Sequence, residues 1–390
     1  MSKSKVPQIR FKGFSEEWED KILYDLSESF EYGLNSAATK YDGKNKYIRI
    51  TDIDDKSRKF NTKDLTSPQV NLEFAENYKL QKGDILFART GASVGKTYIY
   101  KENDGLVYYA GFLIRARIKQ EINADFIFQN TLTKKYDKFI KLTSQRSGQP
   151  GVNAQEYSSY KLFIPNHNEQ TKIGNYFQQL DKLIEQKEKK YQKLKQFKKA
   201  MLDKMFPKNG ADTPEIRFKG FIGKWEEKKL GQLAKITTGS SNRQDSGLDG
   251  KYTFFDRSDD IRTSNIYLFD CEAVIVAGEG SDFVPKYFKG KFDLHQRTYA
   301  IMNFENGDSK FLFYYIHLFR KWFLNQAVGS TVKSLRLPMF QEMVIRYPQK
   351  EEQEKIGNYF QKLDKQIELQ QKELEKLKNI KKASLAKMFV

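Results

Sequence analysis

The segment Gly91–Thr97, with the sequence Gly-Ala-Ser-Val-Gly-Lys-Thr, comes near to a known catalytic motif. It follows an apolar stretch typical of a strand, as a phosphate-binding loop does. That loop places four residues between its two glycines, whereas only three separate Gly91 from Gly95. No apolar strand that ends in a second metal-binding Asp accompanies it. We therefore interpret the segment as a basic turn, with a nuclease or nucleotide hydrolase built on it as an alternative.

Histidine and cysteine, the usual ligands of zinc, are scarce and scattered. The histidines are His167 at a predicted helix start, His295 in a loop and His317 in a helix, and Cys271 is the only cysteine. A zinc site or a disulfide framework is therefore not expected. The Asn-Pro-Pro-Tyr and Asp-Pro-Pro-Tyr motifs of amino-methyltransferases are absent from the sequence. The residues thus predict neither a catalytic site nor a bound metal.

The composition favours a polyanionic partner. The 390 residues include 68 Lys and Arg against 50 Asp and Glu, a formal net charge of +18. Neutralising phosphates with basic side chains releases condensed counterions and drives binding to nucleic acid. A lysine coat that only confers solubility is the alternative. No apolar run approaches the roughly 18 residues needed to cross a membrane, so with a single cysteine we expect a cytoplasmic protein.

Loops that mix Arg, Gln, Ser and Gly carry the side chains that contact phosphates and base edges. Arginine suits guanine, while glutamine and asparagine suit adenine. In the first half of the chain the candidates are Arg89, Thr90, Ser93, Lys96, Gln145, Arg146 and Gln149. In the second half they are Ser241, Arg243, Arg257, Ser258, Arg262, Glu279, Ser281, His295, Gln296, Arg297, Ser330 and Lys333. We predict that these residues bind double-stranded DNA, with a solvated loop as the alternative for each.

Two long segments that repeat one another must position these loops. Residues 169–206 and 352–389 both begin with Glu-Gln-x-Lys-Ile-Gly-Asn-Tyr-Phe-Gln and end with Lys-Met-Phe, at a constant offset of 183 residues. Their apolar residues recur at spacings of three and four, as in a helix packed along another helix, so we predict one coiled coil. The predicted seam residues are Ile173, Phe177, Leu180, Ile184, Tyr191, Leu194, Ile356, Phe360, Leu363, Ile367, Leu374 and Leu377. The same stripe is expected to continue through Phe197 and Ile380.

A second repeat precedes each half. Residues 7–14, Pro-Gln-Ile-Arg-Phe-Lys-Gly-Phe, correspond to residues 214–221, Pro-Glu-Ile-Arg-Phe-Lys-Gly-Phe, at an offset of 207 residues. A short helix is expected to follow in each copy and to end near Gly33 and Gly239. Repetition of this kind means that the chain contains two copies of one plan.

Each half then reads as a mixed α/β globule followed by one long helix. Strands are predicted at 47–50, 84–88, 97–100, 108–114, 252–255, 273–276 and 298–301. A helix is predicted after each strand region, at 124–139 and 310–323. The predicted domains are a first globule 1–166, a central helix 167–207, a linker 208–213, a second globule 214–350 and a C-terminal helix 351–390.

Connectivity predicts the direction of the two helices. The first helix leads from the first globule to the second, and the second helix must return to share the seam. The pair is therefore expected to be antiparallel, with the end of the second helix beside residues 7–14 and the end of the first beside residues 214–221. The predicted fold is mixed α/β, with two globules separated by an antiparallel coiled coil and a pseudo-two-fold internal repeat.

This organisation resembles the specificity subunits of type I restriction–modification enzymes. The resemblance rests on the duplicated Glu-Gln-x-Lys-Ile-Gly-Asn-Tyr-Phe-Gln-x-Leu-Asp helix, on the variable globule before each copy, and on short motifs in the globules. These motifs are residues 83–91 (Gly-Asp-Ile-Leu-Phe-Ala-Arg-Thr-Gly), 277–280 (Ala-Gly-Glu-Gly), 290–292 (Gly-Lys-Phe) and 297–299 (Arg-Thr-Tyr). The resemblance covers essentially the whole chain.

The resemblance implies that each globule is a target-recognition domain for one half of a bipartite, asymmetric DNA site. It implies that the paired helices set the spacing of the half-sites and dock two methyltransferase subunits. Those subunits would bind S-adenosylmethionine and methylate adenine, and restriction subunits attached through them would use ATP and Mg to translocate and cut DNA. No cofactor or catalysis would belong to this chain. A scaffold whose coiled coil binds only protein is the second alternative.

Overall fold

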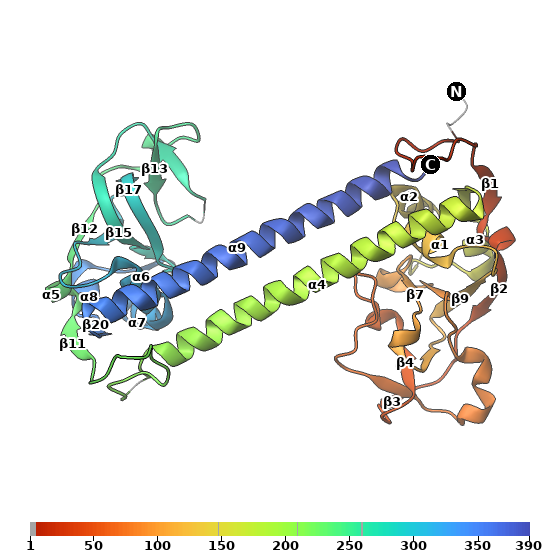
Figure 1. Ribbon diagram of the computed structural model, residues 1–390, viewed down its shortest axis with the longest axis horizontal. Coiled ribbons are helices and arrows are strands. Elements are labelled where there is room, and N and C mark those ends of the chain that lie inside the picture. The colour runs from red at the N-terminus through yellow and green to blue at the C-terminus, as the bar shows by residue number, and fades with distance from the viewer. Residues whose placement is uncertain (1–4, 147, 209, 259) are drawn as a thin grey trace. The chain divides into compact units, whose positions relative to one another are not determined.

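The computed structural model describes residues 5–146, 148–208, 210–258 and 260–390. Four short segments lie outside the described residues. Residues 1–4 belong to the first predicted domain and Asn209 to the predicted linker. Ser147 and Asp259 belong to loops that contain predicted DNA-contacting residues. The chain divides into two compact units (Figure 1): unit 1 contains residues 1–187 and 373–390, and unit 2 contains residues 188–372. Two long helices, α4 (His167–Met205) and α9 (Lys350–Lys387), contribute to both units.

Unit 1 holds a mixed α/β globule with an antiparallel central sheet. The strand order is β2 (Ser27–Tyr32), β9 (Leu113–Ile118), β6 (Ile85–Ala88) and β7 (Thr97–Ile99). Further strand pairs are β1 (Glu19–Ile22) with β10 (Lys161–Ile164), β3 (Ala38–Lys40) with β5 (Thr66–Pro68), and β4 (Lys46–Ile48) with β8 (Val107–Tyr109). The helices are α1 (Ala124–Asn130), α2 (Lys134–Thr143) and α3 (Ala154–Ser158). The 3₁₀ turns are η1 (Leu23–Leu26), η2 (Ile50–Asp52), η3 (Leu72–Phe74), η4 (Glu76–Tyr78), η5 (Gly91–Ser93) and η6 (Glu102–Asp104).

The central sheet of unit 1 is covered on both faces, which explains its uniformly apolar middle strand. All residues of β6 are buried. Ile85 and Phe87 belong to the hydrophobic cluster that also holds Trp18. Leu86 and Ala88 belong to a separate cluster on the other side. This division follows from the pleat of a strand, in which successive side chains point to opposite faces.

Unit 2 repeats the plan around a larger sheet. Its strand order is β12 (Lys235–Thr238), β18 (Thr298–Met302), β15 (Phe269–Ala277), β17 (Lys286–Leu294), β13 (Tyr252–Phe255) and β14 (Arg262–Ser264). Further strand pairs are β11 (Glu226–Lys229) with β20 (Val344–Tyr347) and β16 (Glu279–Gly280) with β19 (Lys333–Ser334). The helices are α5 (Leu230–Leu233), α6 (Ser309–Phe319), α7 (Lys321–Gln326) and α8 (Leu337–Gln341), and η7 spans Arg243–Asp245.

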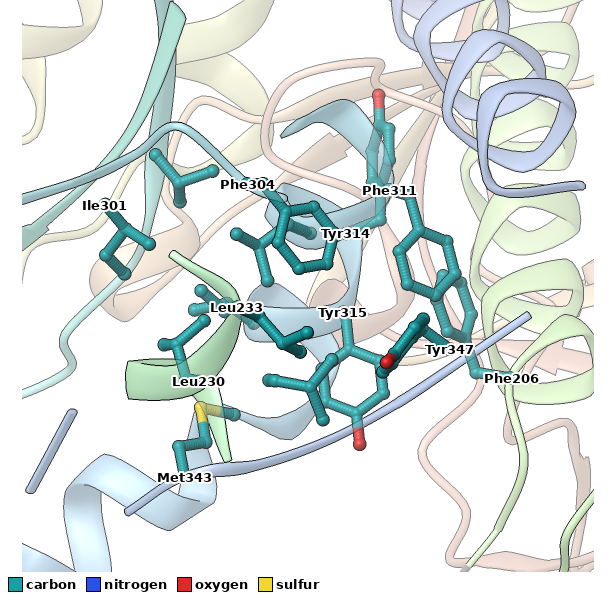
Figure 2. Packing of buried hydrophobic residues seen from close by; sticks show 14 of the residues in the cluster. Phe206, Leu230, Leu233, Ile301, Phe304, Phe311, Tyr314, Tyr315, Met343 and Tyr347 are labelled. Atoms are coloured by element: carbon teal, nitrogen blue, oxygen red, sulfur yellow. The ribbon is translucent and has the colours of Figure 1, made fainter. Parts of the chain in front are cut away.

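The core of unit 2 joins the globule to the end of α4. Phe206, the residue that follows α4, stacks on Phe311 of α6 with ring centroids 5.4 Å apart and on Phe360 of α9 at 6.0 Å. Figure 2 shows Phe206 beside Phe311 within this cluster, with Leu230 and Met343 at its other side. Burial of several large aromatic side chains at one point supplies much of the hydrophobic free energy that holds the long helices to the globule.

The long helices run antiparallel in unit 1, as predicted. Tyr176 Oη of α4 lies 3.0 Å from Ser384 Oγ of α9. Further along α4, Asp181 Oδ1 lies 2.6 Å from Lys381 Nζ, which is earlier in α9. A forward step along one helix is therefore a backward step along the other, and the two lie side by side in Figure 1.

The same order holds in unit 2. Tyr191 Oη donates a hydrogen bond to Gln371 Oε1 at 3.5 Å, and Lys198 Nζ lies 2.5 Å from Asp364 Oδ1. Asp364 Oδ2 also accepts a hydrogen bond of 2.6 Å from Tyr314 Oη, so the same carboxylate joins α4, α9 and α6. The prediction of an antiparallel pair is confirmed within each unit.

The helix ends meet the repeated segments where the sequence predicts. In unit 1 the backbone N–H of Ile9 donates to the carbonyl oxygen of Lys387 at 2.9 Å. In unit 2 the N–H of Ile216 donates to the carbonyl oxygen of Lys204 at 2.9 Å. These residues are equivalent in the two repeats. Each unit therefore contains the same contact between a repeated segment (residues 7–14 or 214–221) and the end of a long helix, which we call the joint.

A buried ion pair strengthens each joint. Arg10 Nε and Nη2 donate to the two carboxylate oxygens of Glu169, both at 2.7 Å. Arg217 makes the equivalent pair with Glu352, at 2.8 and 2.6 Å. Both glutamate side chains are fully buried. The hydrogen bonds to Glu169 raise the pKa of Arg10 above its ordinary value, so the guanidinium stays charged. Two-pronged pairs of this kind fix orientation as well as adding energy.

Predicted seam residues differ in what they contact. Ile173 and Phe177 belong to the core of the unit 1 globule, and Ile356 and Phe360 to the core of the unit 2 globule. These residues anchor each helix to its own globule. Leu363 also belongs to the unit 2 core. The remaining residues, which are buried or half-buried along the helices, are Leu180, Ile184, Tyr191, Leu194, Ile367, Leu374 and Leu377.

The expectation that the apolar stripe continues through Phe197 and Ile380 is wrong. The exposed fraction is 48% for Phe197 and 39% for Ile380. The next residues, Lys198 and Lys381, reach the partner helix instead, through the ion pairs with aspartates described above. A long lysine side chain can cross a helix face and bring its charge to a partner, which an apolar count does not anticipate.

Several expected elements are shorter than predicted. The predicted strand 108–114 is two strands, β8 and β9, because a turn closed by the hydrogen bond from Leu113 N–H to the Ala110 carbonyl interrupts it. The predicted helix 124–139 is likewise split into α1 and α2. There the hydroxyl of Thr133 accepts from the N–H of Tyr136 and caps the second helix.

Three other predicted helices are also shorter than expected: the two that follow the repeated segments 7–14 and 214–221, and the helix at 310–323. The helices expected to end near Gly33 and Gly239 are single turns, η1 and α5, followed by strands β2 and β12. The backbone of both glycines lies against a neighbouring strand, where an added Cβ would lie 2.2 Å from Ala110 O and 1.7 Å from Leu294 O. The predicted helix 310–323 is divided into α6 and α7 at Arg320.

Candidate nucleic-acid interface

The two predicted loops of unit 1 form one surface. Thr90 bridges to Gly151, and the N–H of Gly91 donates to the Pro150 carbonyl at 3.0 Å. The Gln149 side chain lies directly over Gly91, where its Nε2 would be 2.7 Å from an added Cβ. Residues some 60 positions apart in the sequence are therefore brought together at one end of the central sheet.

The predicted residues of this surface differ in accessibility. Gln145, Arg146 and Gln149 are exposed, Arg89, Thr90 and Lys96 are half-buried, and Ser93 is buried. The Arg89 guanidinium lies 4.8 Å from the centre of the Tyr32 ring, which orients it by a cation–π contact. Two further cations have partners within the unit: Lys96 Nζ lies 2.5 Å from Asp55 Oδ1, and Arg146 contacts Glu156.

The backbone of the Gly91–Thr97 turn differs from that of a phosphate-binding loop. Residues after Gly95 enter strand β7 instead of a helix, so the turn lacks the helix N-terminus against which such loops bind phosphate. The Thr97 hydroxyl is buried and hydrogen-bonded to the Thr131 hydroxyl at 2.7 Å. These features agree with the interpretation as a basic turn.

A polar pocket in unit 1 was missed by the sequence interpretation. Its volume is about 340 Å³, and Arg115 and Arg117 of β9 are among the residues that line it. Arg115 is almost fully buried and donates to the carbonyl oxygens of Asn77 and Lys79 at 2.9 and 3.2 Å. Burial lowers the pKa of Arg115 to about 10. The signal available in the sequence was the pair of arginines on alternate positions of the otherwise apolar strand Leu-Ile-Arg-Ala-Arg-Ile.

A buried carboxylate balances this pair of arginines. Asp84 accepts two hydrogen bonds of 3.1 Å from Arg117 and lies 3.9 Å from Arg115. Burial raises the pKa of Asp84, although the hydrogen bonds from Arg117 act in the opposite direction. Because Arg115 donates to the carbonyl oxygens of Asn77 and Lys79, we assign it the role of holding residues 77–79, which line the pocket, in place. Arg117 holds the Asp84 carboxylate.

The predicted residues of unit 2 converge more completely. A pocket of about 320 Å³ lies where several loops meet at one end of the large sheet. Its lining residues are Arg243, Asp256, Arg257, Glu279, His295, Gln296 and Arg297. All but Asp256 were predicted as DNA-contacting residues from separate loops of the sequence. Asp256, missed by sequence reasoning, forms an ion pair with Arg243.

Acidic side chains inside this pocket hold its arginines. Arg243 Nη1 donates to Asp256 Oδ2 at 2.5 Å and also contacts the Ser258 hydroxyl. The N–H of Ser258 donates to the other Asp256 oxygen at 2.8 Å. The pKa of Asp256 is lowered because the hydrogen bonds from Ser258 and the charge of Arg243 outweigh its burial. Asp256 is therefore ionised at neutral pH and fixes Arg243 in place.

A second carboxylate lies between two other arginines. Arg297 Nη1 contacts Glu279 Oε1, and Arg257 Nη1 lies 3.7 Å from Glu279 Oε2. Both arginine side chains are more than half exposed, whereas 19% of the Glu279 side chain is exposed. The neighbouring His295 accepts from the N–H of Arg297 through Nδ1 at 3.1 Å, and burial lowers the pKa of His295 below its ordinary value of 6.5. The imidazole is therefore neutral at pH 7.

The other predicted residues of unit 2 are not among those that line this pocket. Ser281, Ser330 and Lys333 are exposed near the β16–β19 pair, in which Gly280 faces Lys333. Ser241 is buried and its hydroxyl donates to Asp293 Oδ1 at 2.7 Å within the unit. Arg262 is half-buried and donates to the Ser246 carbonyl at 3.0 Å.

Over the ranges that the structure describes, no group of three or more His, Cys, Asp or Glu side chains could hold a metal ion. Within the same ranges, no helix combines the length and apolar character required to cross a bilayer.

A duplicated α/β scaffold that presents two arginine-rich polar surfaces defines a modular recognition protein. A family model described as "Type I restriction modification DNA specificity domain" matches residues 15–196 and 222–379, one copy for each half. Because these segments cover most of the chain, the chain belongs to this family. The resemblance stated from the sequence is therefore confirmed.

Curated relatives agree with the family model. The type I restriction enzyme EcoDI specificity subunit of Escherichia coli is 31% identical over 158 residues, which are 40% of this chain and 35% of that protein. That match therefore spans about a third of the relative. The putative type I restriction enzyme MjaX specificity subunit of Methanocaldococcus jannaschii is 25% identical, over 94% of this chain and 91% of the relative. The MjaVIII specificity subunit of the same organism is 24% identical, over 78% and 77%.

Solved structures confirm the fold. The S subunit of a type I restriction–modification system from M. genitalium superposes with a TM-score of 0.72 at 14% identity, covering 99% of both chains. A chain from a study of complex assembly and conformational transition of the type I R-M system gives a TM-score of 0.50 at 16% identity, covering 94% of this chain and 96% of that one. The predicted mixed α/β fold with two domains and long helices is confirmed.

Proposed function

We propose that this chain is the DNA-specificity subunit of a type I restriction–modification complex, in which each globule reads one half of a bipartite site. One observation carries the proposal. The joints of the two units agree residue for residue, as Arg10–Glu169 and Arg217–Glu352 illustrate, whereas the polar surfaces that the globules present do not correspond. Two globules that have different polar surfaces but the same joint are suited to a DNA site whose two halves differ in sequence.

The paired helices are proposed to set the spacing of the half-sites and to dock two methyltransferase subunits. Phe197 and Ile380 support this role, because they are exposed apolar residues at equivalent positions of the two repeats. Two equivalent surfaces suit two copies of one partner. We further propose that S-adenosylmethionine, ATP and Mg act in the methyltransferase and restriction subunits of an intracellular complex, and that this chain has no catalysis of its own.

A domain exchange tests the proposal. The complex would be expressed with residues 20–165 replaced by the corresponding part of a relative with another target, and the methylated sites of the host DNA would be sequenced. We expect one half-site to change while the other half-site and the spacer stay the same. A change in both half-sites, or methylation without any sequence preference, would contradict it.

The alternatives are tested with the same material. An ATPase or nuclease using the Gly91–Thr97 turn is disfavoured because Lys96 Nζ is paired with Asp55 and the turn leads into a strand. If the chain were such an enzyme, the isolated chain would hydrolyse ATP or cleave DNA, and Lys96→Ala would abolish that activity.

A scaffold that binds only protein is the second alternative. It predicts no sequence-dependent DNA binding even when the methyltransferase subunits are present. Purification of the chain followed by mass spectrometry would detect a stoichiometric methyltransferase partner.

A further inference from the structure

Glu279 and Arg297 form a rigidly placed donor–acceptor pair on the wall of the unit 2 pocket. Glu279 lies in β16, where it faces Ser334 of β19. Arg297 lies in the turn between β17 and β18, and its carbonyl oxygen accepts from the N–H of Gly278 at 2.8 Å. A Cβ at Gly278 would lie 2.6 Å from that oxygen, so only glycine allows the Arg297 turn to approach β16 this closely.

Each member of this pair keeps hydrogen-bonding capacity. A carboxylate can accept about four hydrogen bonds, and the contacts with Arg297 and Arg257 leave part of this capacity at Glu279. The guanidinium of Arg297 has five N–H donors, and its side chain is 62% exposed. The free donors of the arginine and the free acceptor sites of the glutamate therefore lie next to each other.

The charges of the pocket argue against a phosphate as its ligand. Arg243 is neutralised by Asp256, and Glu279 lies between Arg257 and Arg297. A phosphate that approached Arg297 would also approach the Glu279 carboxylate and be repelled by it. A base edge, which carries donors as well as acceptors, has no such conflict.

We propose that the Arg297–Glu279 pair reads a G·C base pair in the major groove. This inference rests on the proposed function and specifies one contact within it. Guanine presents two acceptors there, N7 and O6, and the cytosine of the same pair presents the N4 amino group as a donor. The arginine fork matches the two acceptors, and the carboxylate beside it matches the donor. With adenine in place of guanine, the thymine O4 or methyl group would face the carboxylate; with thymine in place of guanine, the arginine fork would meet a single acceptor, O4, and the methyl group, so both A·T orientations are disfavoured.

The inference is tested in the complete complex by sequencing the methylated sites that variants produce. The wild-type target should contain an invariant G·C pair in the half-site read by unit 2. Glu279→Gln replaces the carboxylate by an amide that can also donate, and Arg297→Lys removes the two-pronged contact while keeping the charge. Each variant should reduce discrimination at that one position by roughly ten-fold and leave the other half-site unchanged.

Glu227→Gln is the matched control, because Glu227 pairs with Arg346 at 2.8 Å on the β11–β20 strands rather than in the pocket. Glu227→Gln should leave the target sequence unchanged.

A second measurement needs no variant. 7-Deazaguanine lacks N7, and wild-type binding to duplexes that carry it at the invariant position should fall roughly ten-fold. An absent G·C pair, an unchanged target in both variants, or unchanged binding to 7-deazaguanine would overturn the inference. Loss of all sequence-dependent binding by the wild-type complex would instead overturn the proposed function.

Discussion

At the scale of single residues, the carboxylates of the joints are buried charges with a single arginine partner in each repeat. The side chain of Glu169 has no exposed surface, and that of Arg10 is 10% exposed. Arg10→Ala would leave the Glu169 charge buried without its cation, which costs about 3–5 kcal/mol of the free energy of unfolding. Hydrogen exchange of unit 1 amides in increasing urea measures this cost separately from unit 2.

The controls for this prediction lie in the same unit. Lys59→Ala removes the cation of a pair with Glu185 in which both side chains are more than 40% exposed, and should cost at most about 1 kcal/mol. Adding Glu169→Gln to Arg10→Ala should recover part of the loss, because no charge is then buried unpaired. Equal costs for Arg10→Ala and Lys59→Ala would contradict the argument.

Residue chemistry in the loops could be predicted only in part. The sequence indicates which side chains can contact DNA, and in unit 2 most of the pocket-lining residues were identified from loops far apart in the chain. It does not indicate which cations already have partners. Lys96, paired with Asp55, and Arg146, which contacts Glu156, could not be distinguished from free cations because their partners lie far away or on another element. Arg115 was missed because it is buried within a strand.

At the scale of elements, a glycine fixes how closely each long helix packs on its globule. An added Cβ at Gly174 of α4 would lie 2.5 Å from Oδ1 of Asn123, the oxygen that caps α1 by accepting from Phe126 N–H. Gly174→Ala gains about 1 kcal/mol of helix propensity but displaces this cap or forces overpacking, which costs about 1–3 kcal/mol. We expect a net destabilisation of unit 1 by about 1 kcal/mol in urea unfolding.

The equivalent glycine and the capping residue provide the comparisons. At Gly357 of α9 the added Cβ would lie 2.4 Å from Asp308 Oδ1 and 2.9 Å from the backbone N of Phe311, and a backbone atom cannot move aside as a side chain can. Gly357→Ala should therefore cost more than Gly174→Ala. In unit 1, Gly174→Ala should cost nothing further once Asn123→Ala has removed the obstructing side chain. Additive costs for that pair would refute the close-packing explanation.

Element prediction succeeded where the pattern is long and failed where local capping decides. The bounds of α4 and α9 follow from an apolar period sustained over many turns, which local irregularities cannot disguise. The break between α1 and α2 depends on the Thr133 hydroxyl, and the break between β8 and β9 on a turn at Gly111. Such breaks involve few residues and little hydrophobic signal, so a window of apolar residues does not reveal them.

At the scale of the whole molecule, the proposed function makes the length of the helix pair a determinant of the DNA target. Inserting seven residues after Glu185 and seven after Lys376 adds two turns to both helices. The Asp181–Lys381 and Lys187–Glu373 contacts show that these two points face each other. A heptad keeps the seam in register. The added length is about 10 Å, or roughly three base pairs, so the spacer should grow by about three base pairs with both half-sites unchanged.

Sequencing of methylated sites from the complex with both insertions measures this spacer directly. An insertion after Glu185 alone is the control: it displaces every later residue of α4 relative to α9, opposes Lys198 to a residue other than Asp364, and should abolish methylation. Because the double insertion leaves both globules and both joints intact, a changed half-site sequence is not expected from it. Methylation at the original spacing would mean that the helices do not set the distance between the half-sites, whatever else they bind.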